Sequence, residues 1–159
     1  MYRKLLLTLD GSEVSAKAVP HAVQIATSSG AEVVLLRVVD SVGHIIAQST
    51  PAGFEMSAGG VTADIAEQAV AAQQQAAQAE LDDVAEQLRA QGVQTVSTVV
   101  AEGIPGDEIV RAADELGCDI VVMATHGRSG LGRAVLGSVA DHVVRHTPKS
   151  AVLLVRVHD

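Results

Sequence analysis

Short apolar runs alternate with segments of helical periodicity along the whole chain. The apolar runs cover residues 4–9, 32–39, 119–124 and 151–157, and residues 93–100 alternate as VQTVSTVV, a further strand pattern. Short apolar runs between turn signals are typical of strands that are buried on both faces. The pattern therefore predicts five strands, most of them inside a parallel sheet.

Helical spacing predicts helices between these strands. Apolar residues recur every three or four positions in the segments 12–29, 63–90, 107–116 and 138–146. Pro20 lies inside the first segment and is expected to kink it, because proline cannot donate a helical hydrogen bond. Residues 41–62 have no period and contain several glycines, which predicts a long mobile loop.

The order of these elements indicates the fold class. Buried strands that alternate with amphipathic helices predict an α/β domain over residues 1–159, with an open five-stranded parallel sheet and helices on both faces. Ligands of such sheets bind at the carboxyl ends of the strands, where the strand order reverses. The segments that follow 4–9, 32–39 and 119–124 are therefore the expected binding loops.

Composition narrows the range of partners. The net charge is −8 and no basic run is present, so neither nucleic acid nor an anionic membrane surface is an expected partner. Tyr2 and Phe54 are the only aromatic residues, which argues against a platform for stacking bases. Cys118 is the only cysteine, which excludes an intrachain disulfide. The first apolar run ends at Leu9, too short for a signal-peptide core, so we expect a soluble cytoplasmic protein.

The most glycine-rich stretch covers residues 124–139, directly after the fourth apolar run. It is not a P-loop, because no lysine stands between Gly137 and Ser138. Two interpretations stay open from the residues alone. In one, the free amides of a helix that begins at Gly137 and Ser138 bind phosphate. In the other, the glycines only permit a turn.

The histidines do not change this picture. His142 and His146 lie four residues apart on a predicted helix, a spacing that can chelate a metal. A solvated face near a helix C-terminus is the simpler interpretation, since histidine also suits the helix dipole there. We therefore predict no metal site made by protein side chains alone.

The glycine-rich stretch and its flanks resemble the universal stress protein family. The resemblance covers the whole chain and rests on the segments LLTLDGSEVSAKAV, LLRVVD, GIPGDEIVRAADELGCDIVVM and MATHGRSGLGRAVLGSVADHVV. It implies a flavodoxin-like or adenine nucleotide α-hydrolase-like sandwich, usually a homodimer. The ATP-binding branch is similar to G-x-x-G, nine residues, then G-[ST]. This chain has Gly127, nine residues, Gly137 and Ser138, but Ala124 replaces the first glycine.

The resemblance also implies which residues would bind ATP. Asp10 would hydrogen-bond the ribose or adenine side, and Val38 would hold adenine through its backbone. From sequence alone, Asp10 could equally be a turn or cap residue and Val38 a core residue. The other residues implied at the site are Thr8, Val39, Met123, Ala124, His126, Gly127, Arg128, Gly137, Ser138 and Val139. Mg²⁺ or Mn²⁺ would arrive with the phosphates.

The expected function is that of an ATP-binding stress or signalling dimer with slow or no hydrolysis, since no lysine or general base is positioned. Two alternatives stay open. In the first, the protein is a dimer of the same family that binds no nucleotide, because Ala124 replaces a motif glycine. In the second, it is an enzyme, since the fold also occurs in nucleotide α-hydrolases. The homodimer would pair strand 151–157 with its copy, because an exposed apolar edge favours unwanted pairing. The sequence does not identify a protein partner.

Overall fold

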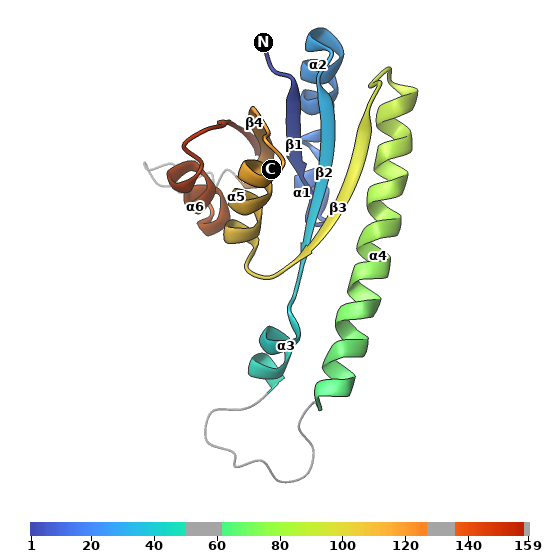
Figure 1. The fold of residues 1–159 in the computed structure, drawn as a ribbon, viewed down its shortest axis with the longest axis vertical. Helices are drawn as coiled ribbons and strands as arrows, with labels where there is room; N and C mark the ends of the chain where they lie inside the picture. Colours follow the sequence, from blue (N-terminus) through green and yellow to red (C-terminus); the bar gives the residue numbers. More distant parts are fainter. Residues whose placement is uncertain (50–61, 127–135, 158–159) are drawn as a thin grey trace.

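The computed structural model describes residues 1–49, 62–126 and 136–157. Its core is one five-stranded sheet with the strand order β3-β2-β1-β4-β5, and every pairing is parallel (Figure 1). The strands are β1 (Lys4–Thr8), β2 (Glu32–Val39), β3 (Val96–Glu102), β4 (Ile120–His126) and β5 (Ala151–Val157). The predicted open parallel sheet is therefore confirmed.

Helices cover both faces of this sheet. They are α1 (Glu13–Ala16), α2 (Val19–Ser29), α3 (Val42–Ser49), α4 (Ala63–Ala90), α5 (Pro105–Glu115) and α6 (Ser138–His146). Alanines and leucines of α2 and α4 pack against one face, and apolar residues of α5 and α6 pack against the other. Figure 1 shows α5 and α6 on the side of the sheet opposite α4. The two layers of helices leave the carboxyl edge of the sheet as the place where loops meet.

The central strand β1 is the most completely buried. Leu5, Leu6 and Leu7 have no exposed surface, because β1 pairs with β2 on one side and β4 on the other. The carboxylate of Asp119 accepts hydrogen bonds from the backbone N–H groups of Arg3 and Lys4, at 2.7 and 2.9 Å. These bonds align the start of β1 with the start of β4.

The structure corrects the prediction of one kinked helix over residues 12–29. Two helices form instead, and Pro20 lies in the first turn of α2. Proline is tolerated there because the first N–H groups of a helix have no carbonyl partner. The chain therefore ends α1 and restarts as α2, so that Pro20 causes no break inside a helix.

The structure also corrects the prediction of a loop over residues 41–62. Residues 42–49 form helix α3, which packs against α4. The pattern was missed because Gly43 lies inside this short helix, and glycine is a poor helix former. Residues 50–61 lie outside the described residues. Helix α4 itself begins and ends where the sequence predicted, with Thr62 as its N-cap.

The remaining boundaries differ by a few residues. Strand β3 begins at Val96, because Val93 packs into the core from the turn that precedes the strand. Strand β4 continues to His126, two residues past the predicted end, and reaches the carboxyl edge of the sheet. No helix in the described ranges is long and apolar enough to cross a membrane.

Candidate functional site

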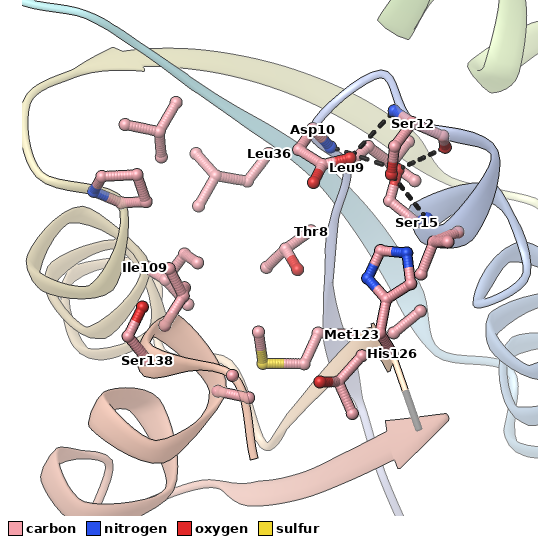
Figure 2. Close-up of a pocket in the computed structure, with 18 residues that line it drawn as sticks. Thr8, Leu9, Asp10, Ser12, Ser15, Leu36, Ile109, Met123, His126 and Ser138 are labelled. Carbon is pink, nitrogen blue, oxygen red and sulfur yellow. Dashed lines mark hydrogen bonds between the residues drawn. The ribbon is translucent and has the colours of Figure 1, made fainter. Parts of the chain in front are cut away.

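A cavity of about 330 Å³ lies at the carboxyl ends of β1, β2 and β4. The strand order reverses between β1 and β4, since the chain proceeds from β1 outward to β2 on one side and from β4 outward to β5 on the other. Open parallel sheets bind ligands at such a point. The cavity volume is in the range of sites for small molecules. Its position and size make it the candidate site of this chain (Figure 2).

The floor of the cavity comes from the sheet face that carries α5 and α6. Leu36, Met123 and Ile109 belong to the apolar cluster on this face, and Val38 packs against it. Alternate residues of a strand share a face, so Thr8 on β1 and Thr125 on β4 lie on the same side. The floor is therefore apolar, with two hydroxyl groups set into it.

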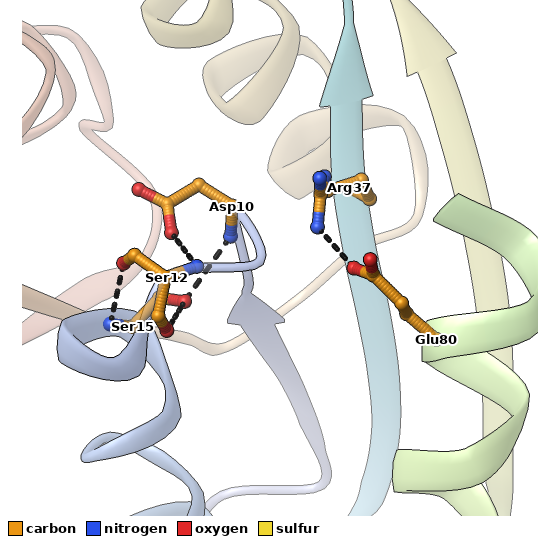
Figure 3. A network of polar contacts seen from close by, with 5 residues as sticks. All are labelled: Asp10, Ser12, Ser15, Arg37 and Glu80. Carbon is orange, nitrogen blue, oxygen red and sulfur yellow. Dashed lines mark hydrogen bonds and ion pairs between the residues drawn. The ribbon is translucent and has the colours of Figure 1, made fainter. Parts of the chain in front are cut away.

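The loop between β1 and α1 forms a polar wall. The N–H of Ser12 donates to the Asp10 carboxylate at 2.9 Å, and the N–H of Asp10 donates to Ser15 Oγ at 3.3 Å. Ser15 Oγ in turn donates to the Ser12 carbonyl at 2.9 Å, and Ser12 Oγ accepts from the Ser15 N–H at 3.1 Å. Figure 3 shows this closed network. Its effect is to hold the carboxylate of Asp10 at the cavity.

The pKa of Asp10 is lowered. Partial burial by itself raises this pKa, but hydrogen bonds from Ser12 and Ser15 and the nearby guanidinium of Arg37 outweigh it. Asp10 is therefore ionised at neutral pH and acts only as a hydrogen-bond acceptor. An ionised carboxylate at the edge of the cavity suits a ligand that offers hydroxyl donors, such as a ribose diol.

Arg37 supports this loop from β2. Its guanidinium pairs with Glu80 of α4 at 2.6 Å (Figure 3). The same guanidinium lies close to Gly11. A Cβ placed on Gly11 would stand 2.3 Å from Arg37 Nη1. Gly11 also has a φ of 80°, in the left-handed region that favours glycine. Glycine is needed here both for the backbone conformation and for the close approach of Arg37.

The opposite wall is the N-terminus of α6. Gly137 is the N-cap and provides no side-chain cap, and Ser138, Val139 and Ala140 all line the cavity. The first N–H groups of a helix have no carbonyl four residues earlier to accept them. The helix dipole adds partial positive charge at the same end. This wall is suited to an anion, so the two walls of the cavity have opposite electrostatic character.

The structure brings nine of the twelve implied site residues to this cavity. They are Thr8, Asp10, Val38, Met123, Ala124, His126, Gly137, Ser138 and Val139. Val39 lies instead on a neighbouring cavity of about 350 Å³, because successive strand residues point to opposite faces. Gly127 and Arg128 lie outside the described residues.

Ala124 lies in a different setting from the one its motif position suggested. It is inside β4, paired with Val155 of β5, and it packs against the core on the α2 and α4 side. Its methyl group therefore lies at the rim of the cavity, on the face opposite to Met123 and Thr125. Replacement of a glycine by alanine here strengthens a strand, since glycine weakens strand interiors.

Several lining residues were not identified from sequence. They are Leu9, Ser12, Val14, Ser15, Leu36, Pro105, Ile109, Thr125 and Ala140. Leu36 could have been found by counting two residues back from Val38 on the same strand face. Pro105 and Ile109 come from the first turns of α5, and nothing in the local pattern places that helix against β1. Within the described ranges, no group of three or more His, Cys, Asp or Glu side chains could hold a metal ion.

Comparison with known proteins agrees with this geometry. The model of the universal stress protein family matches residues 1–156. Universal stress protein MJ0531 of Methanocaldococcus jannaschii is 34% identical over 146 residues, which are 92% of this chain and 78% of that protein.

Two solved structures also share the fold. That of MJ0577, from the same organism, has a TM-score of 0.77 at 27% identity and covers 100% of this chain and 99% of that chain. A universal stress protein described as a complex with cAMP has a TM-score of 0.68 at 24% identity and covers 98% of this chain and 97% of that chain. The match of the family model over nearly the whole length decides the assignment: the chain belongs to the universal stress protein family.

Proposed function

We propose that this protein binds ATP, together with Mg²⁺ or Mn²⁺, in the cavity between β1 and β4. It would act as a nucleotide-responsive homodimer in a stress or signalling response, with slow or no hydrolysis. The observation that carries the proposal is the cavity itself, which joins an ionised carboxylate, an apolar floor and an uncapped helix N-terminus at the reversal of strand order.

Each part of the cavity suits one part of the nucleotide. The apolar side chains of Leu36, Val38 and Met123 can hold a purine without aromatic stacking. The carboxylate of Asp10 can accept hydrogen bonds from the ribose hydroxyls. The free amides of α6 favour phosphate. A family member of the same fold is described as a complex with cAMP, which is consistent with an adenine nucleotide as ligand.

Slow or no hydrolysis is expected because no P-loop lysine stands between Gly137 and Ser138. Asp10 and His126 are the ionisable side chains among the described lining residues, and Arg128 lies outside them. Phosphoryl transfer depends on positive groups that stabilise charge on the transferred phosphoryl. We therefore expect nucleotide to act by shifting the protein between conformations or partners.

Calorimetry tests the binding directly. ATP is titrated into the purified protein with Mg²⁺ and, separately, with Mn²⁺, and mass spectrometry identifies any nucleotide that copurifies. Saturable binding at one site per chain is expected, with little phosphate release over an hour. Absence of binding at millimolar ATP would remove the proposal.

A nucleotide-free dimer is the second candidate, motivated by Ala124. The variant Ala124→Gly restores the motif glycine and serves as the comparison. If the native protein and Ala124→Gly both fail to bind ATP, the nucleotide-free function is favoured. If only Ala124→Gly binds, the methyl group on β4 is what blocks the site.

A further inference from the structure

Two threonine hydroxyls in the cavity floor have no hydrogen-bond partner among residues 1–49, 62–126 and 136–157. Thr8 is 8% exposed and Thr125 is 9% exposed, and neither side-chain hydroxyl forms a hydrogen bond within the part of the chain that the structure describes. Ser15, the third buried polar residue there, is fully engaged by Ser12 and Asp10. The two threonines therefore differ from ordinary buried polar residues, which are almost always paired.

Both hydroxyls reach open space. In the described ranges, no fully occluded side-chain nitrogen or oxygen lacks a partner. An unpaired hydroxyl at Thr8 or Thr125 therefore keeps some accessible surface, and both residues line the cavity. Figure 2 shows Thr8 in the middle of this cavity, with Asp10 and Ser12 on one side and Ser138 on another. A hydroxyl in such a position points to a ligand that offers a complementary polar atom.

The two threonines lie at different depths along the sheet. Leu7 pairs with Val122, so Thr8 lies one residue past this pair and Thr125 lies three residues past it. Thr125 is also close to the start of α6, since a Cβ placed on Gly137 would be 3.6 Å from Thr125 Oγ1. Thr125 therefore belongs to the wall formed by α6, whereas Thr8 lies below the centre of the floor.

The start of α6 and Thr125 make one set of donors. Ser138, Val139 and Ala140 provide N–H groups with no carbonyl partner inside the helix. The first hydrogen bond inside α6 is made by the N–H of Asp141, which donates to the carbonyl of Gly137 at 2.9 Å. The Thr125 hydroxyl, which lies close to Gly137, adds a side-chain donor from β4. Oxygen atoms of a phosphate group can accept from all of these donors.

We propose that Thr125 is a specificity residue that selects phosphorylated nucleosides over unphosphorylated ones. Its hydroxyl donates to the phosphate group that lies against the N-terminus of α6, and Thr8 contacts the nucleoside without touching the phosphate. This inference rests on the proposed function, because it requires an adenine nucleotide in this cavity. It adds to the phosphate site a side chain from a variable position of the glycine-rich motif.

The test compares the affinities of AMP and adenosine by calorimetry. The ratio of the two dissociation constants measures how much the phosphate adds to binding. The variant Thr125→Val removes only the hydroxyl and keeps the branched shape, so we expect the ratio to fall about 10-fold, the usual loss of a hydrogen bond to a charged group. Thr125→Ser keeps the hydroxyl and is expected to retain most of the ratio.

Thr8→Val is the matched control in the same cavity. It removes a hydroxyl of the same burial, and it is expected to weaken AMP and adenosine together and leave their ratio unchanged. A Thr125→Val ratio equal to that of the native protein would overturn the inference, and so would an equal loss of the ratio in Thr8→Val. Thermal unfolding separates a structural role from this one. Because the Thr125 hydroxyl has no partner among the described residues, Thr125→Val is expected to melt no lower than the native protein, and a lower melting temperature would contradict the inference.

The experiment also separates this inference from the proposed function. If the native protein binds neither ATP nor AMP, the proposed function fails and the inference fails with it. The native protein and Thr125→Val can both bind AMP more tightly than adenosine, by the same factor. In that case the proposed function stands and only the inference about Thr125 is wrong.

Discussion

Replacement of Gly11 by alanine tests the contact that supports the Asp10 loop. The new methyl group would lie 2.3 Å from Nη1 of Arg37 and 2.9 Å from its Cζ. Because the clashing atoms belong to the end of a flexible side chain, Arg37 is expected to move away and leave Glu80. Alanine must also adopt a φ near 80°, which costs about 1–2 kcal/mol.

The two costs can be estimated separately. Loss of the Arg37–Glu80 pair adds at most about 1 kcal/mol, since the Glu80 side chain is 55% exposed and solvent screens the interaction. The total expected for Gly11→Ala is therefore about 1–3 kcal/mol, up to about 1 kcal/mol above the backbone cost alone. Gly30 is the matched control, with a φ of 72° and no atom within 4 Å of an added Cβ. Gly30→Ala is expected to cost about 1–2 kcal/mol, from the backbone alone.

Urea unfolding of four variants measures these terms. They are Gly11→Ala, Gly30→Ala, Arg37→Ala and the double variant of Gly11 and Arg37. In the Arg37→Ala background the methyl group meets no guanidinium, so the cost of Gly11→Ala should fall to that of Gly30→Ala. Equal costs for Gly11→Ala and Gly30→Ala in the native background would show that Arg37 does not approach Gly11, and the account of this loop would be wrong.

Three further predictions concern other parts of the molecule. Because the pKa of Asp10 is lowered in the fold, the ionised carboxylate stabilises the fold above its ordinary pKa of 3.8, and this stabilisation is lost as the pH falls below that pKa. Asp10→Asn should therefore lose less stability between pH 5 and 2 in chemical denaturation. A pH profile of stability equal to that of the native protein would contradict the hydrogen-bond network around Asp10. Burial raises the pKa of Cys118 to about 11, so a disulfide reagent at pH 8 should label this thiol only after the protein unfolds. Rapid labelling of the folded protein would show that the Cys118 thiol is accessible. Leu154→Asp on β5 should convert the proposed dimer to monomers or aggregates, as measured by light scattering. Val99→Asp, on the opposite edge strand β3, is the control and should leave the protein dimeric. A dimer that survives Leu154→Asp would exclude β5 as the interface.

The order of elements could be predicted from sequence because it depends on local periodicity. Helices α4 and α6 were predicted with their observed ends, since the helical period begins and ends with them, and the structure adds Thr62 as the N-cap of α4. Helix α3 was not, because its stability comes from packing on α4, which no local pattern contains. Pro20 was assigned to a helix interior because its true position, in the first turn of a second helix, depends on where α1 ends.

The site could be predicted only where a motif names the residue. Asp10 and Ser138 follow from recognisable loops, and the structure brings both to one cavity. Thr125 lies inside the motif but at one of its variable positions, so its burial and its nearness to Gly137 could be learned only from the folded chain. Ile109 reaches the cavity from a helix whose placement depends on the whole sheet.

The pairing of β1 with β4 has a consequence for how the protein is synthesised. Lys4 and Asp119 are hydrogen-bonded in the fold although they are 115 residues apart in sequence. During synthesis, β1 is therefore made long before β4, the strand that covers its second edge. Contacts of such separation slow folding, because the chain must close a long loop before it gains them. The cavity needs both strands and the start of α6, so a ribosome-bound or truncated chain that ends before residue 140 has no complete site. Occupancy by a nucleotide would therefore report that a molecule has finished folding, and the ligand would protect from proteolysis only the completed chains.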